Sequence, residues 1–343
     1  ESRDIRSFYL APHDQKPLPP FLPGQYLTFQ LTINAKPVVR CYSLSESPNH
    51  PDYYRVTIKR IPAPKDMAGI PPGLVSNYFH DHLAEGDILD VKAPTGHFTL
   101  DMTTQTPVVL IAGGVGITPL LCMVNTAIDA GSRREIWLFY GVRNRIEQIM
   151  KEHLEQVARE HPNVRLQVCY SDPGPEDLKG QDYHHGERVT VALLKRALPS
   201  SNYQFFICGP PPMMDQLIRD LKGWGVPEKD IVIEAFGPTT VKRVAPAIEG
   251  GAAARRTDVT IEVTFAKSGK TVRWNGEVGS LLDFAEKNGI SINFGCRAGN
   301  CGTCLTAIKE GEVDYLVEQG AKPETGSCLA CIAIPRTNVV LDA

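Results

Sequence analysis

The 343-residue sequence contains no apolar run long enough to cross a bilayer. Its longest apolar run, Pro107 to Leu121, is interrupted by three glycines and falls short of the roughly 20 residues that a membrane helix needs. A signal peptide, internal repeats and an excess of either charge are also lacking, since 36 basic and 39 acidic residues leave a net charge of −3. These absences disfavour a membrane-spanning, exported or nucleic-acid-binding protein and favour the cytoplasm.

Four of the nine cysteines have the spacing of a metal site. Cys296, Cys301 and Cys304 form a C-x4-C-x2-C run, and Cys331 follows after residues 305–330. This is the spacing of a plant-type [2Fe–2S] site, so we predict these four cysteines as cluster ligands. The pair of C-x2-C motifs that includes Cys328 would also suit tetrahedral zinc, but zinc would leave Cys296 without a role.

The sequence divides into three predicted domains and a linker. Residues 1–103 alternate short β-rich runs with turn residues, which predicts a small antiparallel β-barrel. Residues 104–238 alternate strands with helices, which predicts an α/β doubly wound parallel sheet. Residues 239–256 lack periodicity and indicate a linker, whereas 257–343 show the hairpin, helix and cysteine loop of a β-grasp ferredoxin domain. The predicted fold class is therefore multidomain.

Hydrophobic periodicity also sets the bounds of single elements. In the first domain it predicts strands at Ile88–Lys92 and His97–Leu100 and a helix that starts near Ser76. In the second domain it predicts a helix from Glu147 to Glu160.

A short motif at the end of an apolar strand, Arg40-Cys41-Tyr42-Ser43, is a candidate flavin site. It offers an arginine for a diphosphate, an aromatic ring for stacking and a small hydroxyl for flavin N5. Backbone amides at the helix start near Ser76 would add an anion site. Taken alone, the motif also fits a partly solvated strand end.

Three segments at strand ends in the second domain are candidate ligand-binding segments, and the first two are the candidate nucleotide-binding turns. Ala112–Pro119 follows a buried strand and opens a helix, so its glycines and the helix N-terminus favour a pyrophosphate. Cys208–Pro212 ends another parallel strand at the same sheet edge, and Glu234–Pro238 ends the last strand with an aromatic beside a carboxylate. Because the first segment departs from G-x-G-x-x-G, a tight packing turn remains its alternative.

Together these motifs resemble the ferredoxin–NADP⁺ reductase superfamily. The motifs GQY, RxYS, GxVSNxxHxH, GVGxTP, CGP and ExFGP follow the order found in the reductase portion of flavohaemoglobins, over nearly all of residues 1–238. Residues 257–343 resemble plant-type ferredoxins. The domain order is similar to that of phthalate dioxygenase reductase and phenylacetyl-CoA epoxidase reductase.

The resemblance implies a role for each matching residue. The flavin, expected to be FAD because of the Gly73–His82 segment, would contact Tyr26, Arg40, Cys41, Tyr42 and Ser43. Its diphosphate would lie on Gly73, Leu74, Val75 and Ser76. The nicotinamide nucleotide would bind Gly114, Val115, Gly116, Ile117, Thr118, Pro119, Cys208, Gly209 and Pro210, while Ala235, Phe236, Gly237 and Pro238 would cover the isoalloxazine ring. Ser43, Thr118 and Cys208 would align hydride transfer, and Glu234 would stabilise charge near the reacting rings.

The function implied is an NAD(P)H-dependent iron–sulfur flavoprotein reductase. Electrons would pass from the nicotinamide through FAD and the [2Fe–2S] cluster to a protein acceptor, with a Rieske or di-iron oxygenase expected first and a haem protein next. Two alternatives remain open: the electron-supply module of a longer polypeptide with a fused N-terminal domain, and an iron–sulfur redox sensor with little turnover. The acceptor and the oligomeric state are not predicted.

The nicotinamide cofactor is expected to be NADH. The third strand of the nucleotide domain runs into Asp172, whose carboxylate would repel a 2′-phosphate and accept hydrogen bonds from a ribose hydroxyl. Arg143 and Arg145 follow the second strand and would reverse the preference towards NADPH if they reached the same phosphate.

Overall fold

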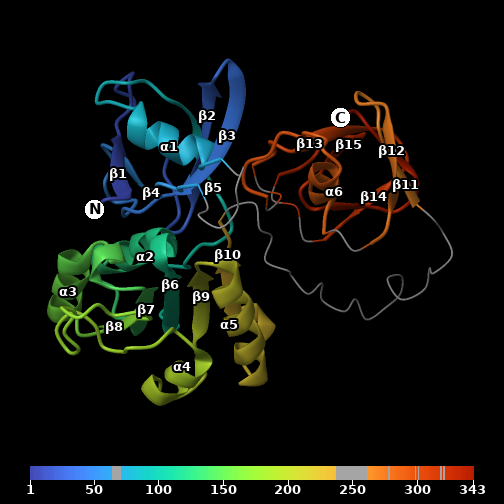
Figure 1. Cartoon of the computed structure of the whole chain (residues 1–343). Helices are drawn as coiled ribbons and strands as arrows, with labels where there is room; N and C mark the ends of the chain where they lie inside the picture. The colour runs from blue at the N-terminus through green and yellow to red at the C-terminus, as the bar shows by residue number, and fades with distance from the viewer. Residues whose placement is uncertain are drawn as a thin grey trace. The chain divides into compact units, whose positions relative to one another are not determined.

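The computed structural model describes residues 1–63, 71–236, 261–276, 279–297, 299, 301–316, 319 and 321–343 (Figure 1). The described chain divides into two compact units, one of residues 1–27 and 42–236, the other of residues 28–41 and 261–343. The predicted linker, residues 239–256, and the predicted site residues Gly237 and Pro238 lie outside the described residues.

The first part of the chain is an antiparallel β domain, as predicted, with its strands in two sheets. One sheet pairs β1 (Ile5–Leu10) with β4 (Tyr54–Lys59), and the other has the order β3 (Lys36–Ser43), β2 (Tyr26–Ile33), β5 (Asp90–Thr95). Helix α1 is Leu74–Asp81. These segments form strands because their β-forming apolar side chains, such as Leu27, Phe29 and Val56, are fully buried in the sheets.

Helix α1 lies where a helix start near Ser76 was predicted, but two strand predictions in this domain were wrong. Strand β5 starts two residues later than Ile88, at Asp90, and ends at Thr95 rather than Lys92. His97–Leu100 is not a strand. The backbone turns at Gly96 with φ of +127°, after which Leu100 donates to the carbonyl of Pro23, so Phe98 and Leu100 are buried without joining a ladder.

The nucleotide domain is a five-stranded parallel sheet with the order β10, β9, β6, β7, β8 (Figure 1). Its strands are β6 (Val108–Gly113), β7 (Ile136–Val142), β8 (Val164–Tyr170), β9 (Gln204–Cys208) and β10 (Ile231–Glu234). Side chains of α2 (Ile117–Asp129) and α3 (Lys151–Glu160) share one apolar core with the sheet, and those of α4 (Val191–Ala197) and α5 (Pro211–Gly223) share another. Helices thus cover both faces, and the predicted doubly wound fold is confirmed.

The predicted helix over Glu147–Glu160 is shorter in the structure. A 3-10 turn at Arg145–Glu147 ends before α3 begins at Lys151. Met150, between them, has a left-handed backbone with φ of 56°, which no continuous α-helix accommodates.

The ferredoxin domain has a mixed five-stranded sheet, consistent with the predicted fold class. Its order is β12 (Lys270–Trp274), β11 (Ile261–Phe265), β17 (Val339–Leu341), β13 (Leu305–Glu310), β15 (Ser327–Leu329), in which only β11 and β17 run parallel. A second pair joins β14 (Val313–Tyr315) and β16 (Ala333–Pro335). Helix α6 (Leu281–Lys287) begins where the Ser280 hydroxyl accepts a hydrogen bond from the Asp283 amide, which caps the helix.

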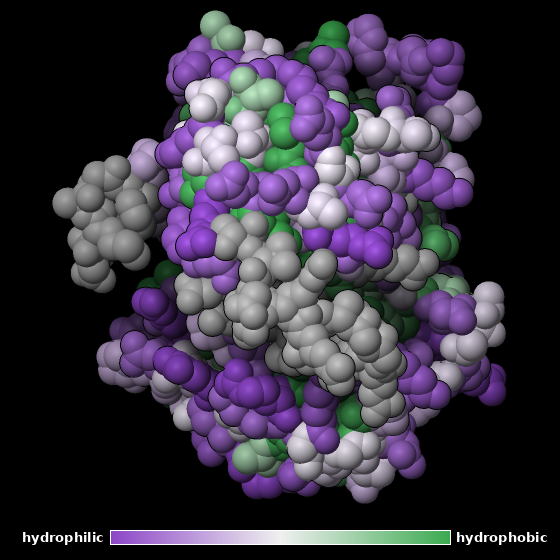
Figure 2. Space-filling model, turned by 90° about the vertical axis from the view of Figure 1, so that its right-hand side faces the viewer, coloured by the Kyte–Doolittle hydropathy of each residue, from purple (hydrophilic) through white to green (hydrophobic). Residues whose placement is uncertain are grey.

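The surface is polar over much of the face shown in Figure 2, where apolar side chains are scattered among hydrophilic ones. The most exposed large apolar side chains, Ile88 and Ile146, are far apart in the sequence. Single apolar side chains of this kind are usual on protein surfaces. Among the described residues, no helix is both long and apolar enough to cross a membrane.

Candidate functional site

Two predicted nucleotide-binding turns meet at the centre of the parallel sheet. The chain passes from β6 to β7 and β8 on one side, then returns to β9 and β10 on the other, so β6 and β9 flank the point where the strand order reverses. The turn after β6 holds Gly114–Gly116, and the turn after β9 holds Gly209 and Pro210. Ligands of open α/β sheets bind outside the carboxyl ends of the strands at such a point.

Glycine is required where these turns touch. A Cβ added to Gly116 would lie 2.2 Å from the carbonyl oxygen of Cys208, and one on Gly113 would lie 2.6 Å from Cδ of Pro210. Gly114 adopts φ of +54°. The backbones of the two turns therefore come into close contact at this edge, and glycine turns of this kind suit the close approach of a pyrophosphate.

Three of the four predicted catalytic residues lie together at this edge. The hydroxyl of Ser43, at the end of β3, donates a 3.2 Å hydrogen bond to Oε2 of Glu234 at the end of β10. Glu234 is paired in register with Cys208 on β9. The fourth, Thr118, is buried in the first turn of α2 and donates its hydroxyl to the carbonyl of Val115, so it supports the glycine turn from within.

The carboxyl group of Glu234 favours its protonated form. Although the residue keeps some exposure at the surface, burial raises the pKa of its carboxyl to about 8, and the hydrogen bond from Ser43 opposes this only in part. Burial, and secondarily Glu234, also raises the pKa of the Cys208 thiol, which is fully covered. At neutral pH the site thus presents a neutral carboxyl group and a neutral thiol.

The predicted flavin residues line the ends of β2 and β3. Tyr26 is buried, and a Cβ on Gly96 would lie 3.0 Å from its ring. Arg40 donates to the carbonyl of Val39, and Sγ of Cys41 lies 3.4 Å from Oγ1 of Thr28. The Tyr42 ring packs edge-on against Phe79 of α1, with centroids 5.3 Å apart.

The start of α1 has the form of an anion site. Gly73 precedes the helix and has no side chain with which to cap its first amides. Ser76 is turned back, with its hydroxyl donating to the carbonyl of Gly73 and accepting from the amide of Ile61. The Asn77 side chain donates to the carbonyls of Gly73 and Ile61, so this turn is fixed in place. Leu74 is exposed and Val75 is buried.

At the end of the last strand, the described part of the predicted ring-covering segment is Ala235 and Phe236. Both are partly buried, Ala235 against one core of the nucleotide domain and Phe236 against the other.

The four predicted cluster ligands form two pairs of thiols. In the first pair, the amide of Cys296 donates to Sγ of Cys301 and the amide of Cys301 donates to Sγ of Cys296, both at 3.3 Å. In the second pair, Sγ of Cys304 lies 3.0 Å from Sγ of Cys331. One thiol of each pair has a lowered pKa, Cys301 through hydrogen bonding from Cys296 and Cys304 through hydrogen bonding from Cys331. The same contact with Cys304 raises the pKa of the Cys331 thiol, so the thiolate form that binds iron is favoured in one cysteine of each pair.

This two-plus-two donor set fits a binuclear iron–sulfur cluster. Each iron of a [2Fe–2S] cluster takes two cysteine sulfurs, whereas a single zinc ion takes all four donors at once. The backbone of the cysteine loop turns sharply, since Arg297, Gly299 and Gly302 all have positive φ. Such turns would let the loop fold closely around a cluster.

Cys328 differs from Cys331 in its surroundings. It is fully buried on β15, opposite Thr306 of β13, and burial raises the pKa of its thiol to about 12. Cys331, not Cys328, contacts Cys304. The geometry thus supports Cys331 as the fourth ligand.

The residues that bear on the nicotinamide cofactor lie after β7 and β8. The amide of Asp172 donates to the carbonyl of Arg143 at 2.9 Å, which places the two backbones side by side. Both arginines have acidic partners: Arg143 pairs with Glu147 at 3.7 Å, and Arg145 lies 3.7 Å from Glu176 and 3.8 Å from Asp177. These ion pairs are partly exposed and therefore weak.

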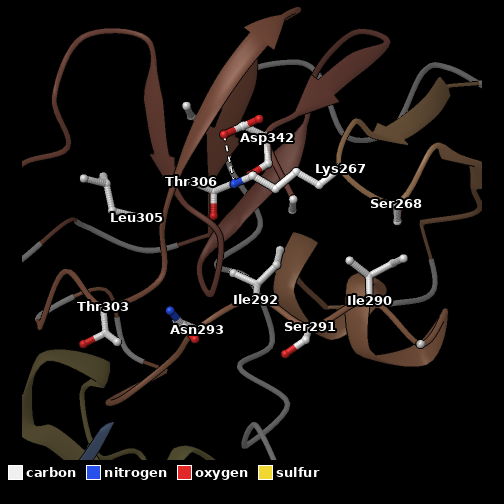
Figure 3. Close-up of a pocket in the computed structure, with 13 residues that line it drawn as sticks. Lys267, Ser268, Ile290, Ser291, Ile292, Asn293, Thr303, Leu305, Thr306 and Asp342 are labelled. Atoms are coloured by element: carbon white, nitrogen blue, oxygen red, sulfur yellow. Dashed lines mark hydrogen bonds and ion pairs between the residues drawn. The ribbon is translucent and has the colours of Figure 1, made fainter. Parts of the chain in front are cut away.

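A separate hollow of about 520 Å³ lies in the ferredoxin domain (Figure 3). Lys267 and Asp342 form a 3.0 Å ion pair on its wall, and none of the predicted site residues lines it. Thr303, which lines this hollow, also belongs to the cluster loop, where its Oγ1 lies 3.2 Å from Sγ of Cys301.

Comparisons with known proteins match the three domains separately. Residues 1–100 match the oxidoreductase FAD-binding domain, residues 110–218 the oxidoreductase NAD-binding domain, and residues 263–336 the 2Fe-2S iron-sulfur cluster binding domain. The FAD/NAD-binding domain of nitric oxide dioxygenase from Vibrio cholerae is 30% identical, with a TM-score of 0.59, over 69% of this chain and 94% of that one. Phthalate dioxygenase reductase is 26% identical, with a TM-score of 0.58, over 100% of this chain and 94% of that one.

The chain belongs to the ferredoxin–NADP⁺ reductase-like family. It joins the family's FAD/NAD module to a C-terminal [2Fe–2S] ferredoxin domain, and it is structurally similar to phthalate dioxygenase reductase. FAD, NAD(P)H and a [2Fe–2S] cluster are the cofactors of this flavin- and iron–sulfur-dependent oxidoreductase.

Its curated relatives are longer proteins. A flavohemoprotein of Halalkalibacterium halodurans is 41% identical over 240 residues, which are 69% of this chain and 57% of that protein. The chain therefore spans somewhat more than half the length of the flavohemoproteins that it matches.

Proposed function

We propose that this chain is an NADH-dependent reductase that delivers single electrons to a protein acceptor, most directly an oxygenase component. The observation that carries the proposal is the pair of cysteine pairs, Cys296 with Cys301 and Cys304 with Cys331, in the chain that also has an FAD/NAD module. When bound, the nicotinamide supplies a hydride, the flavin converts it to single electrons, and the cluster carries them.

The residues of the chain position these groups. The turns at Gly114–Pro119 and Cys208–Pro210 would hold the nicotinamide nucleotide, because they meet where the strand order of the sheet reverses and Gly116 lets their backbones touch. Ser43 and Glu234 would meet the reacting rings, and the buried neutral carboxyl of Glu234 would hold a proton there without adding charge. Thr118 would keep the turn rigid through its bond to Val115.

The flavin would lie on the ends of β2 and β3 and at the start of α1. Arg40 and the amides from Gly73 to Ser76 supply positive character for its diphosphate. Tyr26, Cys41 and Tyr42 would contact the ring system or its chain, and Ala235 to Pro238 would cover the ring. Gly237 and Pro238 enter this proposal from the sequence motif alone.

NADH is the proposed donor. Asp172 stands beside Arg143 at the edge where the adenosine ribose would bind, and the nearby arginines have acidic partners at 3.7–3.8 Å. The 2′-phosphate of NADPH would lie near the carboxylate of Asp172, while the guanidinium groups of Arg143 and Arg145 are already paired with acidic side chains. The 2′-hydroxyl of NADH could instead donate a hydrogen bond to that carboxylate.

The likeness to phthalate dioxygenase reductase over the full length of this chain supports an oxygenase as the acceptor, either a Rieske or a di-iron protein. A haem protein is the next acceptor. A second function, the electron-supply module of a longer polypeptide with a fused N-terminal domain, is favoured by the flavohemoproteins, of which the chain spans 57–59%. We also propose the domain bounds 1–103, 104–238 and 257–343, the linker 239–256, and a cytoplasmic location, where a reducing environment protects cluster thiolates.

Steady-state assays with two acceptors test the function. We expect the whole chain to reduce both ferricyanide and cytochrome c with NADH, and a fragment of residues 1–238 to keep ferricyanide reduction but lose most cytochrome c reduction. Equal cytochrome c activity in the fragment would show that the cluster is not the exit for electrons. Negligible turnover of the whole chain with both acceptors would favour a redox sensor.

A further inference from the structure

A chain of polar contacts joins the flavin domain to the nucleotide domain away from the reacting groups. The side-chain amide of Asn125, on α2, donates a 2.8 Å hydrogen bond to Oε1 of Glu46. The other carboxylate oxygen of Glu46 pairs with Arg55 of β4 at 2.8 Å. On the far side, Nε2 of His153, on α3, lies 2.8 Å from Oδ1 of Asn125, and because that oxygen only accepts, His153 donates.

The contacts are buried, so their geometry is constrained. Asn125 and Arg55 are 6% and 8% exposed, and the charged ends of Glu46 and Arg55 are nearly as well covered. Arg55 also donates to the hydroxyl and the carbonyl of Ser45. Breaking a buried bond leaves its partner unsatisfied, which costs more than the bond contributes. The two domains are therefore held in one arrangement at this point.

The two residues of the central hydrogen bond, Glu46 and Asn125, lie on segments that lead to the hydride-transfer site. Glu46 follows Ser43 by three positions, just after β3. Asn125 lies on the same helix as Ile117 and Thr118, the end of the nucleotide-binding turn. Two residues before Asn125, Met123 reaches the flavin domain, since a Cβ on Gly24 would lie 2.6 Å from its Cε.

We propose that Asn125 is a positioning residue for hydride transfer. Through its bond to Glu46, it fixes α2 and the nucleotide turn at one separation from the strand end that carries Ser43. The inference rests on the proposed function, because it assumes a nicotinamide on that turn and a flavin beside Ser43. Loss of the bond would widen the separation between the reacting rings while leaving each cofactor's own contacts in place.

Rapid mixing with NADH under anaerobic conditions gives the first test. We expect Asn125→Ala to slow flavin reduction at saturating NADH by roughly 10- to 100-fold, since a displacement near 1 Å can cost about two orders of magnitude. Binding of NAD⁺ should change by less than about threefold, because the turn itself is intact. The control is Asn163→Ala, which removes two hydrogen bonds to Ser132 and Arg134 within the nucleotide domain and should reduce its flavin at the wild-type rate.

A swap of the two side chains tests the bond itself. Asn125→Asp keeps the size of the residue but sets two carboxylates against each other, so it should be slow. Adding Glu46→Gln restores an amide–carboxylate pair in the opposite sense and should recover several-fold of the rate. The same recovery should appear without turnover, as renewed protection of α2 amides from hydrogen exchange.

The outcomes separate the inference from the function. A swapped variant no faster than Asn125→Asp, or an Asn125→Ala variant within about twofold of the wild-type rate, would overturn the positioning role. If instead the wild-type flavin is not reduced by NADH at all, the proposed function fails, and the exchange data alone then decide whether the bond holds the domains together.

Discussion

Oγ of Ser43 lies 3.2 Å from Oε2 of Glu234, although 191 residues separate them in the sequence. The contact joins the last residue of a flavin-domain strand to the last residue of the nucleotide-domain sheet. Since Cys208 is the register partner of Glu234, the contact also lies beside the turn that would hold the nicotinamide nucleotide. Small polar groups from both domains thus meet at the one place where a hydride would cross.

Replacing Glu234 by Gln should slow flavin reduction more than it weakens nicotinamide binding. Glutamine keeps the size and can still accept from Ser43, but it cannot exchange a proton or take up charge. We expect kcat to fall roughly 10- to 100-fold with KM changed by less than about threefold, which is the pattern of an interaction used mainly in the transition state. Stopped-flow reduction by NADH measures this.

Glu228→Gln is the matched control, because Glu228 lies at the surface in an ion pair with Lys222. It should behave as the wild type. If Glu234→Gln raised KM and left kcat unchanged, Glu234 would serve binding rather than hydride transfer.

The raised pKa of Glu234 also predicts how stability depends on pH. The folded-state pKa of about 8 lies above the ordinary glutamate value of 4.5, so the folded protein holds this proton more tightly than the unfolded chain. Relative to Glu234→Gln, the wild type should therefore lose stability as pH rises from about 4.5 to 8, by roughly 2–4 kcal/mol in total, and the difference should level off above that range. Thermal unfolding of both proteins between pH 5 and 9 checks this, and a constant difference would contradict the buried neutral carboxyl.

Replacing single cysteines by serine should show that Cys331 is a cluster ligand and that the nearby Cys328 is not. Cys331→Ser should abolish or badly destabilise the cluster, because it removes one of two contacting thiols, whereas Cys328→Ser should leave the visible absorption intact. Iron and sulfide analysis with absorption spectra measures both. Loss of the cluster in Cys328→Ser but not in Cys331→Ser would reverse the assignment, and zinc in place of iron would end the electron-transfer role of this domain.

Cofactor preference should favour NADH by tens-fold to hundreds-fold in kcat/KM, which corresponds to about 2–3 kcal/mol for a partly exposed like-charge contact. Asp172→Ala should narrow the preference, because the carboxylate that repels a 2′-phosphate is removed. Arg143→Ala is the informative comparison, because a backbone hydrogen bond places Arg143 beside Asp172, where its side chain could reach the same phosphate. A wild-type preference for NADPH that survives Asp172→Ala but disappears in Arg143→Ala would show that the arginine decides.

Local signals predicted much of this molecule. The turn from Gly114 to Pro119 was predictable because a buried strand, glycines and a helix start follow one another within a few residues. The cysteine spacing likewise predicted a metal loop, and the close contact of Cys304 with Cys331 agrees with it. Both patterns are short in sequence and are dictated by their own backbone.

What depended on distant partners was not predictable. The helix predicted over residues 147–160 was too long, because nothing in the hydrophobic periodicity of that segment shows that Met150 adopts φ of 56°. His97–Leu100 has strand composition but bonds to Pro23 instead of a ladder. Glu46, Arg55, Asn125 and His153 were missed entirely, since the bond between Glu46 and Asn125 spans 79 residues and neither residue belongs to a motif.

Freeze-quench electron paramagnetic resonance after anaerobic mixing with NADH tests the central claim most directly. The claim is that electrons from NADH pass through the flavin and leave through the cluster held by the two cysteine pairs. The account predicts that the signal of the reduced [2Fe–2S] cluster grows after flavin reduction and at least as fast as steady-state cytochrome c reduction. A flavin that is reduced while the cluster stays oxidised throughout turnover would contradict it.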